Sequence, residues 1–347
     1  MKKVLLGMSG GVDSSVSAIL LQKQGYEVIG ITMALSKETD DADAKKVCQE
    51  LGIEHHFVDM KNEFKKHVID NFIDCYANAK TPNPCIECNR KLKFGVMFEK
   101  AKELGCDYLA TGHYANIEYS DKYNQCVLKK GDAIGKDQSY VLYTLPSDML
   151  ENVIFPLGKF KTKDEIRKIA KENNLNVVAN KPDSEDICFI PDGNYKKFLE
   201  ENSNIKPKTG NIVLQNGTVL GKHSGLYNYT IGQRKGLGIA YKEPLFVLGF
   251  NVRKNEVIVG TKEEVYKDFT VVENVNILID NLEIENLHVK VKTRYSNQES
   301  EAILQIIDSN MIKINFIEPV KALTPGQSAV FYIDDVVIGG GIIKKVD

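Results

Sequence analysis

The chain has 347 residues, with 45 basic and 47 acidic side chains and a formal net charge of −2. Hydrophobic residues make up 43% and charged residues 27%, which is typical of a soluble globular protein and excludes a disordered chain. At roughly 150 residues per domain, this length predicts two or three domains.

Membrane insertion and export are not expected. No apolar run approaches the ~18 residues that a membrane-spanning helix needs. Residues 1–4 lead directly into a strand-like segment without an apolar signal region, so we expect no export signal. The seven cysteines are an odd number, which argues against a disulfide scaffold. We therefore expect a cytoplasmic protein whose thiols stay reduced.

Strand-like and helix-like patterns alternate in the first half of the chain. Buried strands are expected at residues 4–8, 28–33, 56–60 and 108–111, and helices at residues 16–25, 42–52 and 89–105. This order predicts a parallel sheet with helices on both faces, in which ligands bind at the carboxyl ends of the strands. A capping box at residues 162–165 predicts one more helix, to about residue 174.

The pattern changes after about residue 200, where strand-like segments replace helices. An Asn216-Gly217 turn predicts a hairpin at residues 212–220. Further short strands are expected at residues 287–293, 302–307, 311–316, 329–333 and 336–338. The predicted fold class is α/β followed by β modules. We expect a parallel-sheet domain at residues 1–200, a central β module at residues 201–262 and a C-terminal β-barrel at residues 263–347.

Residues 7–14, Gly-Met-Ser-Gly-Gly-Val-Asp-Ser, join the first strand to the first helix. The glycines let an anion approach the main chain, Ser9 and Ser14 add hydroxyl donors, and the helix N-terminus adds free N–H groups. The loop has neither the Gly-Lys-Ser/Thr of a Walker A motif nor a dinucleotide-binding G-x-G-x-x-G. It resembles the signature of the ATP-pyrophosphatase (PP-loop) family, which implies that ATP is split to AMP and pyrophosphate while a substrate oxygen is adenylated.

Residues 81–90, Thr-Pro-Asn-Pro-Cys-Ile-Glu-Cys-Asn-Arg, place two cysteines at the start of a predicted helix. The helix N-terminus and the nearby Arg90 and Lys91 predict a lowered thiol pKa at Cys88. A structural zinc site would need a second cysteine pair at ligand spacing, which the other cysteines do not supply. Cys188 follows an acidic stretch but lies between apolar residues, so packing in the core is the alternative for it.

Three stretches together, residues 7–14, 81–93 and 183–190, resemble the tRNA-specific 2-thiouridylase family. Further matching motifs are Ala-Thr-Gly-His-Tyr at 110–114, Lys-Asp-Gln-Ser-Tyr at 136–140, Tyr-Thr-Ile-Gly-Gln-Arg-Lys-Gly-Leu-Gly at 229–238 and Thr-Pro-Gly-Gln at 324–327. The resemblance covers nearly the whole chain and implies ATP-dependent 2-thiolation of the wobble uridine of tRNA.

The resemblance also implies roles for single residues. The residues implied to bind ATP are Gly7, Met8, Ser9, Gly10, Gly11, Val12, Asp13, Ser14, Met33 and Gly112. Those implied to meet the flipped target base are Asn83, Pro84 and Cys85. Those implied to contact tRNA are His113, Lys136, Asp137, Gln138, Arg294, Tyr295 and Gln327. Cys88 would be the catalytic nucleophile and Cys188 the cysteine that carries the persulfide sulfur.

The implied chemistry is adenylation of the uracil C2 oxygen by ATP with Mg²⁺, followed by sulfur transfer from the persulfide. The implied partners are the anticodon stem-loop of a tRNA and a persulfide-donating sulfurtransferase or cysteine desulfurase. Residues 221–242 contain no Asp or Glu, and their cations with Tyr227, Tyr229 and Tyr241 suit an RNA backbone.

Two departures from the family pattern leave alternatives open. Many members have Asp where this chain has Cys85, and a third thiol permits an iron–sulfur cluster on Cys85, Cys88 and Cys188 that would hold the sulfide instead. Residues 34–43 form a shorter segment than is usual in the family. A different adenylating PP-loop enzyme and a non-catalytic RNA-binding protein are the other hypotheses, and the intact loop at residues 7–14 argues against the second.

Overall fold

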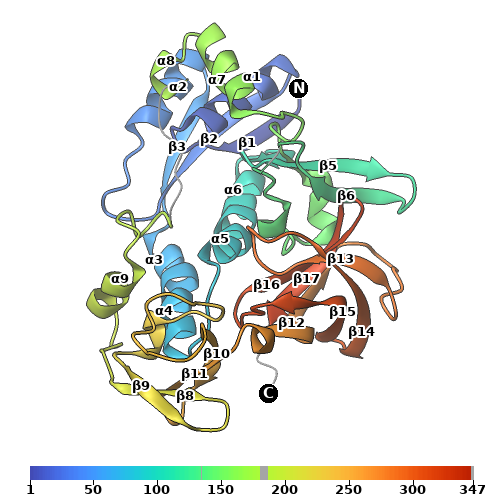
Figure 1. Cartoon of the computed structure of the whole chain (residues 1–347). Coiled ribbons are helices and arrows are strands. Elements are labelled where there is room, and N and C mark those ends of the chain that lie inside the picture. Colours follow the sequence, from blue (N-terminus) through green and yellow to red (C-terminus); the bar gives the residue numbers. More distant parts are fainter. Residues whose placement is uncertain (134, 180–186, 345–347) are drawn as a thin grey trace.

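The computed structural model describes residues 1–133, 135–179 and 187–344. Figure 1 shows an α/β unit at the top, a small β module at the lower left and a β-barrel at the lower right. None of the described helices is long and apolar enough to cross a membrane.

The α/β unit is built on a five-stranded parallel sheet in the order β3-β2-β1-β4-β7. Its strands are β1 (Lys3–Gly7), β2 (Glu27–Ala34), β3 (Glu54–Asp59), β4 (Tyr108–Ala110) and β7 (Val153–Ile154). In β1, Val4 and Leu6 pack into one core and Leu5 into another, so the strand is buried on both faces. The predicted parallel sheet is confirmed.

Helices cover both faces of this sheet. The face of Val4 and Leu6 is covered by α1 (Val12–Lys23), α2 (Ala42–Leu51), α7 (Lys163–Glu172) and α8 (Asn176–Ala179). The face of Leu5 is covered by two long helical segments. These are α3 (Lys61–Phe64), η1 (Lys65–Ile69) and α4 (Asp70–Ala77), then α5 (Pro84–Cys88), η2 (Asn89–Val96) and α6 (Met97–Glu103). The short helices η3 (Ser139–Val141) and η4 (Ser147–Asn152) follow later in the chain.

The helical segment formed by α5, η2 and α6 begins at Pro84, earlier than the predicted residue 89. Asn83 is its N-cap and accepts a hydrogen bond from the N–H of Ile86 at 3.4 Å, and Pro84 is its first residue. Proline suits that position because its missing N–H would have no helical partner there. Both Cys85 and Cys88 therefore lie inside the helix.

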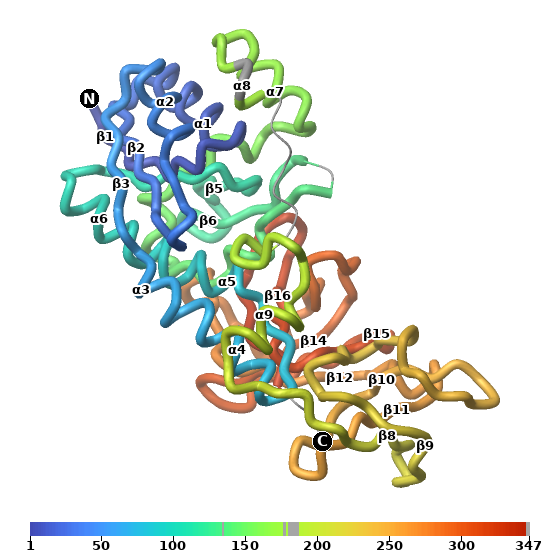
Figure 2. The backbone as a smooth tube through the Cα atoms, turned by 90° about the vertical axis from the view of Figure 1, so that its left-hand side faces the viewer, coloured from blue at the N-terminus to red at the C-terminus, as the bar shows by residue number. Residues whose placement is uncertain are grey.

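The central module follows α9 (Tyr195–Asn202) and holds a four-stranded sheet in the order β10-β11-β8-β9. Its elements are β8 (Gly210–Leu214), β9 (Val219–His223), η5 (Leu226–Asn228), β10 (Phe246–Asn251) and β11 (Glu256–Gly260). The predicted hairpin is confirmed: β8 and β9 pair antiparallel, and Gly217 has φ of +86° in the turn. Figure 2 shows this module beside the barrel strands β12 and β15.

The C-terminal part is a closed antiparallel barrel after η6 (Glu263–Val265). Its strands are β12 (Tyr266–Ile277), β13 (His288–Lys292), β14 (Ser300–Asp308), β15 (Met311–Lys321), β16 (Ser328–Ile333) and β17 (Val336–Ile343). They follow the order β12-β15-β14-β13-β16-β17, and β17 pairs with β12 to close the ring. Closure removes the exposed sheet edges, and the predicted barrel is confirmed.

The barrel is joined firmly to the α/β unit. A hairpin that was not predicted, β5 (Ala115–Ser120) and β6 (Gln125–Lys130), leaves the α/β unit and pairs with β17. Tyr140 donates to the carbonyl of Ser328 at 2.8 Å, and Tyr143 lies within 3.0 Å of the Ser328 hydroxyl. The core around Leu5 continues into barrel residues such as Val330, so both parts share one hydrophobic core.

Candidate functional site

The predicted phosphate loop lies at the carboxyl end of β1. Gly10 has φ of +72°, and a Cβ there would lie 2.8 Å from the Cβ of Asp43, so glycine is required against the first turn of α2. The Ser9 N–H donates to Ser14 Oγ at 3.2 Å, and Ser14 Oγ donates to the Gly11 carbonyl at 3.1 Å. Gly11 is the N-cap of α1 and has no side chain to cap the first N–H groups, which suits them to an anionic ligand.

Two distant segments close on this loop. Tyr114 donates to Asp13 Oδ1 at 2.7 Å, and the Nζ atom of Lys163 lies 2.6 Å from Asp13 Oδ2. A Cβ on Gly112 would lie 3.2 Å from the main-chain carbonyl carbon of Asp13. Met33, half-buried in β2, pairs in register with Val58 on the same edge of the sheet. The residues predicted to bind ATP therefore share one sheet edge, and their binding role stays a prediction.

The cysteine-bearing loop is held by the barrel. Gln327 donates its side-chain amide to the carbonyls of Thr81 at 2.9 Å and Pro82 at 3.1 Å. Gly326 has φ of +91°, and a Cβ there would lie 2.9 Å from the carbonyl oxygen of Thr81. The Thr81 N–H donates to the Pro325 carbonyl at 2.9 Å. Gln327, predicted to contact tRNA, thus supports the loop that carries the predicted base-binding residues.

The thiols of Cys85, Cys88 and Cys188 lie within range of electrostatic interaction with one another. Desolvation of the sulfur, with smaller contributions from the thiols of Cys88 and Cys85, raises the pKa of Cys188 to about 11. Burial also raises the pKa of Cys88, which is 8% exposed, and the pKa of Cys85. Cys188 is exposed to solvent, whereas the acidic stretch at residues 183–186 lies outside the described residues. The two cysteines predicted to act together are 100 positions apart in the sequence, and the fold brings them within range of electrostatic interaction.

The prediction of a lowered pKa at Cys88 is wrong. The helix begins at Pro84, so Cys88 is not at its exposed end, and desolvation dominates. Arg90 pairs with Glu87 at 2.6 Å. The nearby cation that opposes this rise is Lys93, whose positive charge lowers the pKa of each of the three thiols and so offsets part of the effect of burial.

Lys93 is a site residue that the sequence pattern does not reveal. It lies five positions after Cys88, a spacing that places two residues on different faces of an α-helix. The segment η2 is π-helical, with hydrogen bonds from i to i+5, which brings residues five apart onto nearly the same face. Lys93 is half-buried, and its ammonium interacts favourably with the thiolate forms of Cys85, Cys88 and Cys188.

His113 lies next to the segment that packs on the phosphate loop, and its ring is buried. It follows Gly112, which touches Asp13, and its ring packs between Phe94 and Phe155. Burial holds the pKa of His113 well below its usual range, and the Lys93 ammonium lowers it further. His113 is only 7% exposed, so it offers little surface to a ligand. Its contact with tRNA stays a prediction.

The predicted tRNA contacts at residues 136–138 lie in a loop with internal hydrogen bonds. Asp137 accepts from the N–H groups of Gly131 and Ser139, each at 3.0 Å. Gln138 accepts from the N–H of Tyr114 at 2.9 Å. Lys136 is partly exposed. Asp137 and Gln138 thus shape the loop beside Tyr114, and a direct contact of these residues with tRNA remains a prediction.

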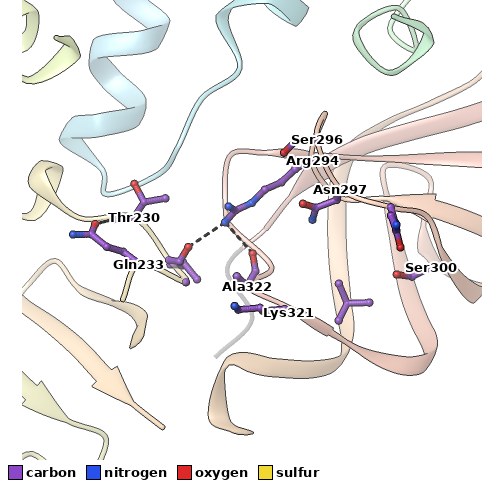
Figure 3. A pocket seen from close by; sticks show the side chains of 12 residues that line it. Thr230, Gln233, Arg294, Ser296, Asn297, Ser300, Lys321 and Ala322 are labelled. Atoms are coloured by element: carbon purple, nitrogen blue, oxygen red, sulfur yellow. Dashed lines mark hydrogen bonds between the residues drawn. The ribbon is translucent and has the colours of Figure 1, made fainter. Parts of the chain in front are cut away.

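Arg294 lies between the central module and the barrel. Its Nη2 donates to the carbonyls of Ile231 and Ala322, each at 3.1 Å, and to the hydroxyl of Thr324. Figure 3 shows this arginine in the wall of a cavity of about 710 Å³. The described residues that line this cavity carry amides, hydroxyls and cations, such as Gln233, Asn297, Ser296 and Lys321, and none of them is Asp or Glu.

Tyr295, the other predicted barrel contact, is 40% exposed. Burial raises the pKa of its phenol, and Asp137 and Cys85 raise it further, so Tyr295 lies near the cysteine loop.

In residues 221–242, Arg234 and Lys235 are exposed as expected for an RNA-facing surface. Tyr227 is 5% exposed and its ring packs in a core with Phe72, so its predicted contribution to an RNA-binding surface stays a prediction.

No three His, Cys, Asp or Glu side chains gather at metal-ligand spacing within residues 1–133, 135–179 and 187–344. The three thiols as placed here therefore do not fit a preformed iron–sulfur site.

Three family models match the chain in sequence order. Residues 2–192 match the family described as the tRNA methyl transferase HUP domain, and residues 196–261 match the tRNA methyl transferase PRC-barrel domain. Residues 267–343 match the aminomethyltransferase β-barrel domain.

Curated proteins match over the full length. A protein of Acetivibrio thermocellus named tRNA-specific 2-thiouridylase MnmA is 46% identical, with 99% of each chain covered. A protein of the same name from Clostridioides difficile is 45% identical, with 99% of this chain and 98% of that one covered. Among solved structures, a 4-thiouridine synthetase–RNA complex with bound ATP is 21% identical with a TM-score of 0.37, over 58% of this chain and 50% of that one.

Proposed function

Because this chain belongs to the tRNA-specific 2-thiouridylase family, we propose that it replaces the C2 oxygen of the wobble uridine of tRNA with sulfur, using ATP. The observation that supports this proposal is that Cys88 and Cys188 lie within range of electrostatic interaction, while Gly112 packs against Asp13 of the phosphate loop. With this arrangement, adenylation by ATP and sulfur transfer from the thiols can act on the same base.

The first step is adenylation. A carbonyl oxygen is a poor leaving group, so the uracil O2 attacks the α-phosphorus of ATP, the α–β bond breaks and pyrophosphate leaves. Loop residues Ser9 to Ser14 and the N-terminus of α1 support this step, because they offer N–H and hydroxyl donors to phosphate oxygens. Mg²⁺ would accompany the nucleotide and offset the charge of the departing pyrophosphate.

The second step moves sulfur from a persulfide on Cys188. In one route the Cys88 thiolate attacks the inner sulfur of the persulfide and releases hydrosulfide, which attacks C2 and expels AMP. In the other, the outer persulfide sulfur attacks C2 and expels AMP, and Cys88 then attacks Cys188 to free the thiolated base. Both routes leave a Cys88–Cys188 disulfide, and a dithiol reductant supplies the two electrons that restore the thiols.

Lys93 supports the attack of Cys88 in either route. The thiolate is the nucleophile, and burial disfavours it at neutral pH. The Lys93 ammonium offsets part of that cost, because it interacts favourably with the charged form of each thiol. Exposure of Cys188 supports loading by a persulfide-donating sulfurtransferase or cysteine desulfurase in the cytoplasm.

The tRNA would approach over the barrel and the central module. The target base must leave the stack of the anticodon loop to reach the thiols. The exposed ring of Tyr295, next to Cys85, is placed to stack on such a base, together with Asn83 and Pro84. The carboxylate-free cavity around Arg294 and Lys321 suits the phosphate and ribose groups of the RNA backbone.

The test uses anaerobic protein, ATP, Mg²⁺, a persulfide donor and unmodified tRNA, with mass spectrometry of the digested nucleosides. We expect 2-thiouridine, AMP and pyrophosphate in equal amounts. ATP cleavage that proceeds without tRNA would favour an adenylating enzyme for a small molecule. Iron analysis of the same protein tests the cluster alternative that Cys85 raises, because a cluster requires stoichiometric iron.

A further inference from the structure

Lys163 occupies an unfavourable position for a cation. It is the first residue of α7, where the N-terminus carries partial positive charge. Its side chain is 11% exposed, so it has also lost most of its hydration. Its Nζ atom lies 2.6 Å from Asp13, which is in the first turn of α1. The ion pair therefore joins the beginnings of two helices.

The position of Lys163 is fixed by the fold of α7. Thr162 caps the helix by accepting from the Glu165 N–H at 3.4 Å, and its hydroxyl donates to Glu165 Oε1 at 2.9 Å. Ile166 and Ala170 are fully buried and pack in the core that also holds α1. These contacts hold the first turn of α7 against the phosphate loop whether or not Asp13 is present.

The arrangement concentrates positive potential where phosphate is expected. Residues 7–14 contain no Lys or Arg, whereas other phosphate loops place a lysine on the β- and γ-phosphates. Here Lys163 brings an ammonium group from 150 positions further along the chain. Tyr114, 4% exposed, holds the Asp13 carboxylate with a hydrogen bond of 2.7 Å, and its ring lies 5.8 Å from the same ammonium.

We propose that Lys163 is a ligand of the β- and γ-phosphates of ATP and that Asp13 holds its ammonium in place before the nucleotide arrives. The inference rests on the proposed use of ATP and adds a residue outside the loop motif. When ATP binds, the ammonium exchanges the carboxylate for phosphate oxygens. During adenylation it stabilises the charge that builds up on pyrophosphate as the α–β bond breaks.

The test compares ATP, pyrophosphate and AMP binding to Lys163→Met and to the wild type by calorimetry with Mg²⁺ and without tRNA. Loss of one charge-assisted hydrogen bond should weaken ATP and pyrophosphate binding by about 10- to 100-fold. AMP has no β- or γ-phosphate, so its affinity should stay within about twofold. Lys163→Arg keeps the charge and should retain pyrophosphate affinity within about fivefold.

The matched control is Lys168→Met, one turn further along α7, where the side chain is 77% exposed and pairs only loosely with Glu172 at 3.8 Å. It should bind all three ligands as the wild type does. Unchanged pyrophosphate affinity in Lys163→Met, or an equal loss of AMP and pyrophosphate, overturns the inference. If thermal denaturation shows that Lys163→Met does not fold, Lys163→Arg takes its place in the test. A folded Lys163→Arg that loses about 10- to 100-fold in pyrophosphate affinity also overturns the inference. Wild-type protein that binds ATP but never thiolates tRNA would refute the proposed function and leave this inference standing.

Discussion

The side-chain amide of Gln327 donates to the main-chain carbonyl of Thr81 at 2.9 Å, across 246 positions of the sequence. This contact joins the C-terminal barrel to the loop that leads into Cys85 and Cys88. The barrel thereby fixes the position of the thiols relative to the sheet. A barrel proposed to receive tRNA therefore also positions the residues proposed to modify it.

Replacing Gln327 with Ala should loosen the cysteine loop. Two hydrogen bonds are lost, each worth about 1 kcal/mol, so the melting temperature should fall by a few degrees. Single-turnover thiolation should slow by about tenfold while ATP affinity is unchanged. Gln305→Ala, on an exposed position of β14, is the control and should have neither effect. A Gln327→Ala enzyme with wild-type thiolation would show that the loop is held by other contacts.

Cys88→Ser and Cys188→Ser should each abolish 2-thiouridine formation, because either route needs both sulfur atoms. Nucleoside mass spectrometry gives the readout. Pyrophosphate release with tRNA present should persist in both variants, because adenylation precedes sulfur transfer and needs neither thiol. Cys126→Ser, in β6 of the barrel-linked hairpin, is the control and should retain full activity. Thiolation by either catalytic variant would rule out the paired-thiol mechanism.

Cys85→Asp should retain thiolation, since the persulfide route uses only Cys88 and Cys188. The purified wild type should contain no stoichiometric iron after anaerobic preparation. An inactive, folded Cys85→Asp enzyme together with one bound cluster per chain would replace the persulfide route with the cluster route.

Lys93→Met should shift the pH dependence of Cys88 reactivity. Burial raises the pKa of Cys88 and Lys93 opposes that shift, so removal of the ammonium moves the thiol pKa higher. A higher thiol pKa lowers the thiolate population near neutral pH and leaves it unchanged in strong base. The rate of alkylation at Cys88 by iodoacetamide, located by mass spectrometry, measures this directly.

Two controls accompany the Lys93 experiment. Lys93→Arg should keep the wild-type profile, and so should Lys102→Met, whose side chain is 58% exposed and pairs with Glu99. A loss of reactivity that is equal at every pH would point to misfolding of the helix instead of an electrostatic role.

His113→Asn should change how stability depends on pH. Burial lowers the pKa of His113 in the folded protein below the usual value of 6.5, so the unfolded chain binds more protons in acid. The free energy of unfolding of the wild type should therefore fall below about pH 6.5, by up to about 1.4 kcal/mol per pH unit from this group. The difference in melting temperature between wild type and His113→Asn should shrink as the pH falls. His288→Asn, at a position 61% exposed, should leave the difference constant.

Local patterns predicted the parts of this fold that depend on local chemistry. The glycine loop at residues 7–14, the capping box at Thr162 and the Asn-Gly hairpin each specify their own backbone, and each is present. The cysteine helix begins at Pro84 and not at the predicted residue 89. A proline disfavours helix in the residue before it but suits the first position of a helix, so the local sequence is compatible with both starts.

The rest of the site depends on contacts between distant segments. Lys163 reaches the phosphate loop only because α7 packs on α1, and the sequence contains no sign of that pairing. Lys93 faces the thiols only because the helix is π-helical there. His113 follows a strand end, which suggests a surface loop, yet Phe94 and Phe155 cover it. Burial of this kind is set by the whole fold and not by neighbouring residues.

The hydrophobic core that runs from Leu5 through Tyr143 to Val330 has a practical consequence for anyone who wishes to dissect this enzyme. A fragment ending before the barrel would leave the tyrosines of residues 140–143 and the outer strand β6 bare to water. Such a truncation should aggregate on expression, so the α/β unit and the barrel should be expressed together.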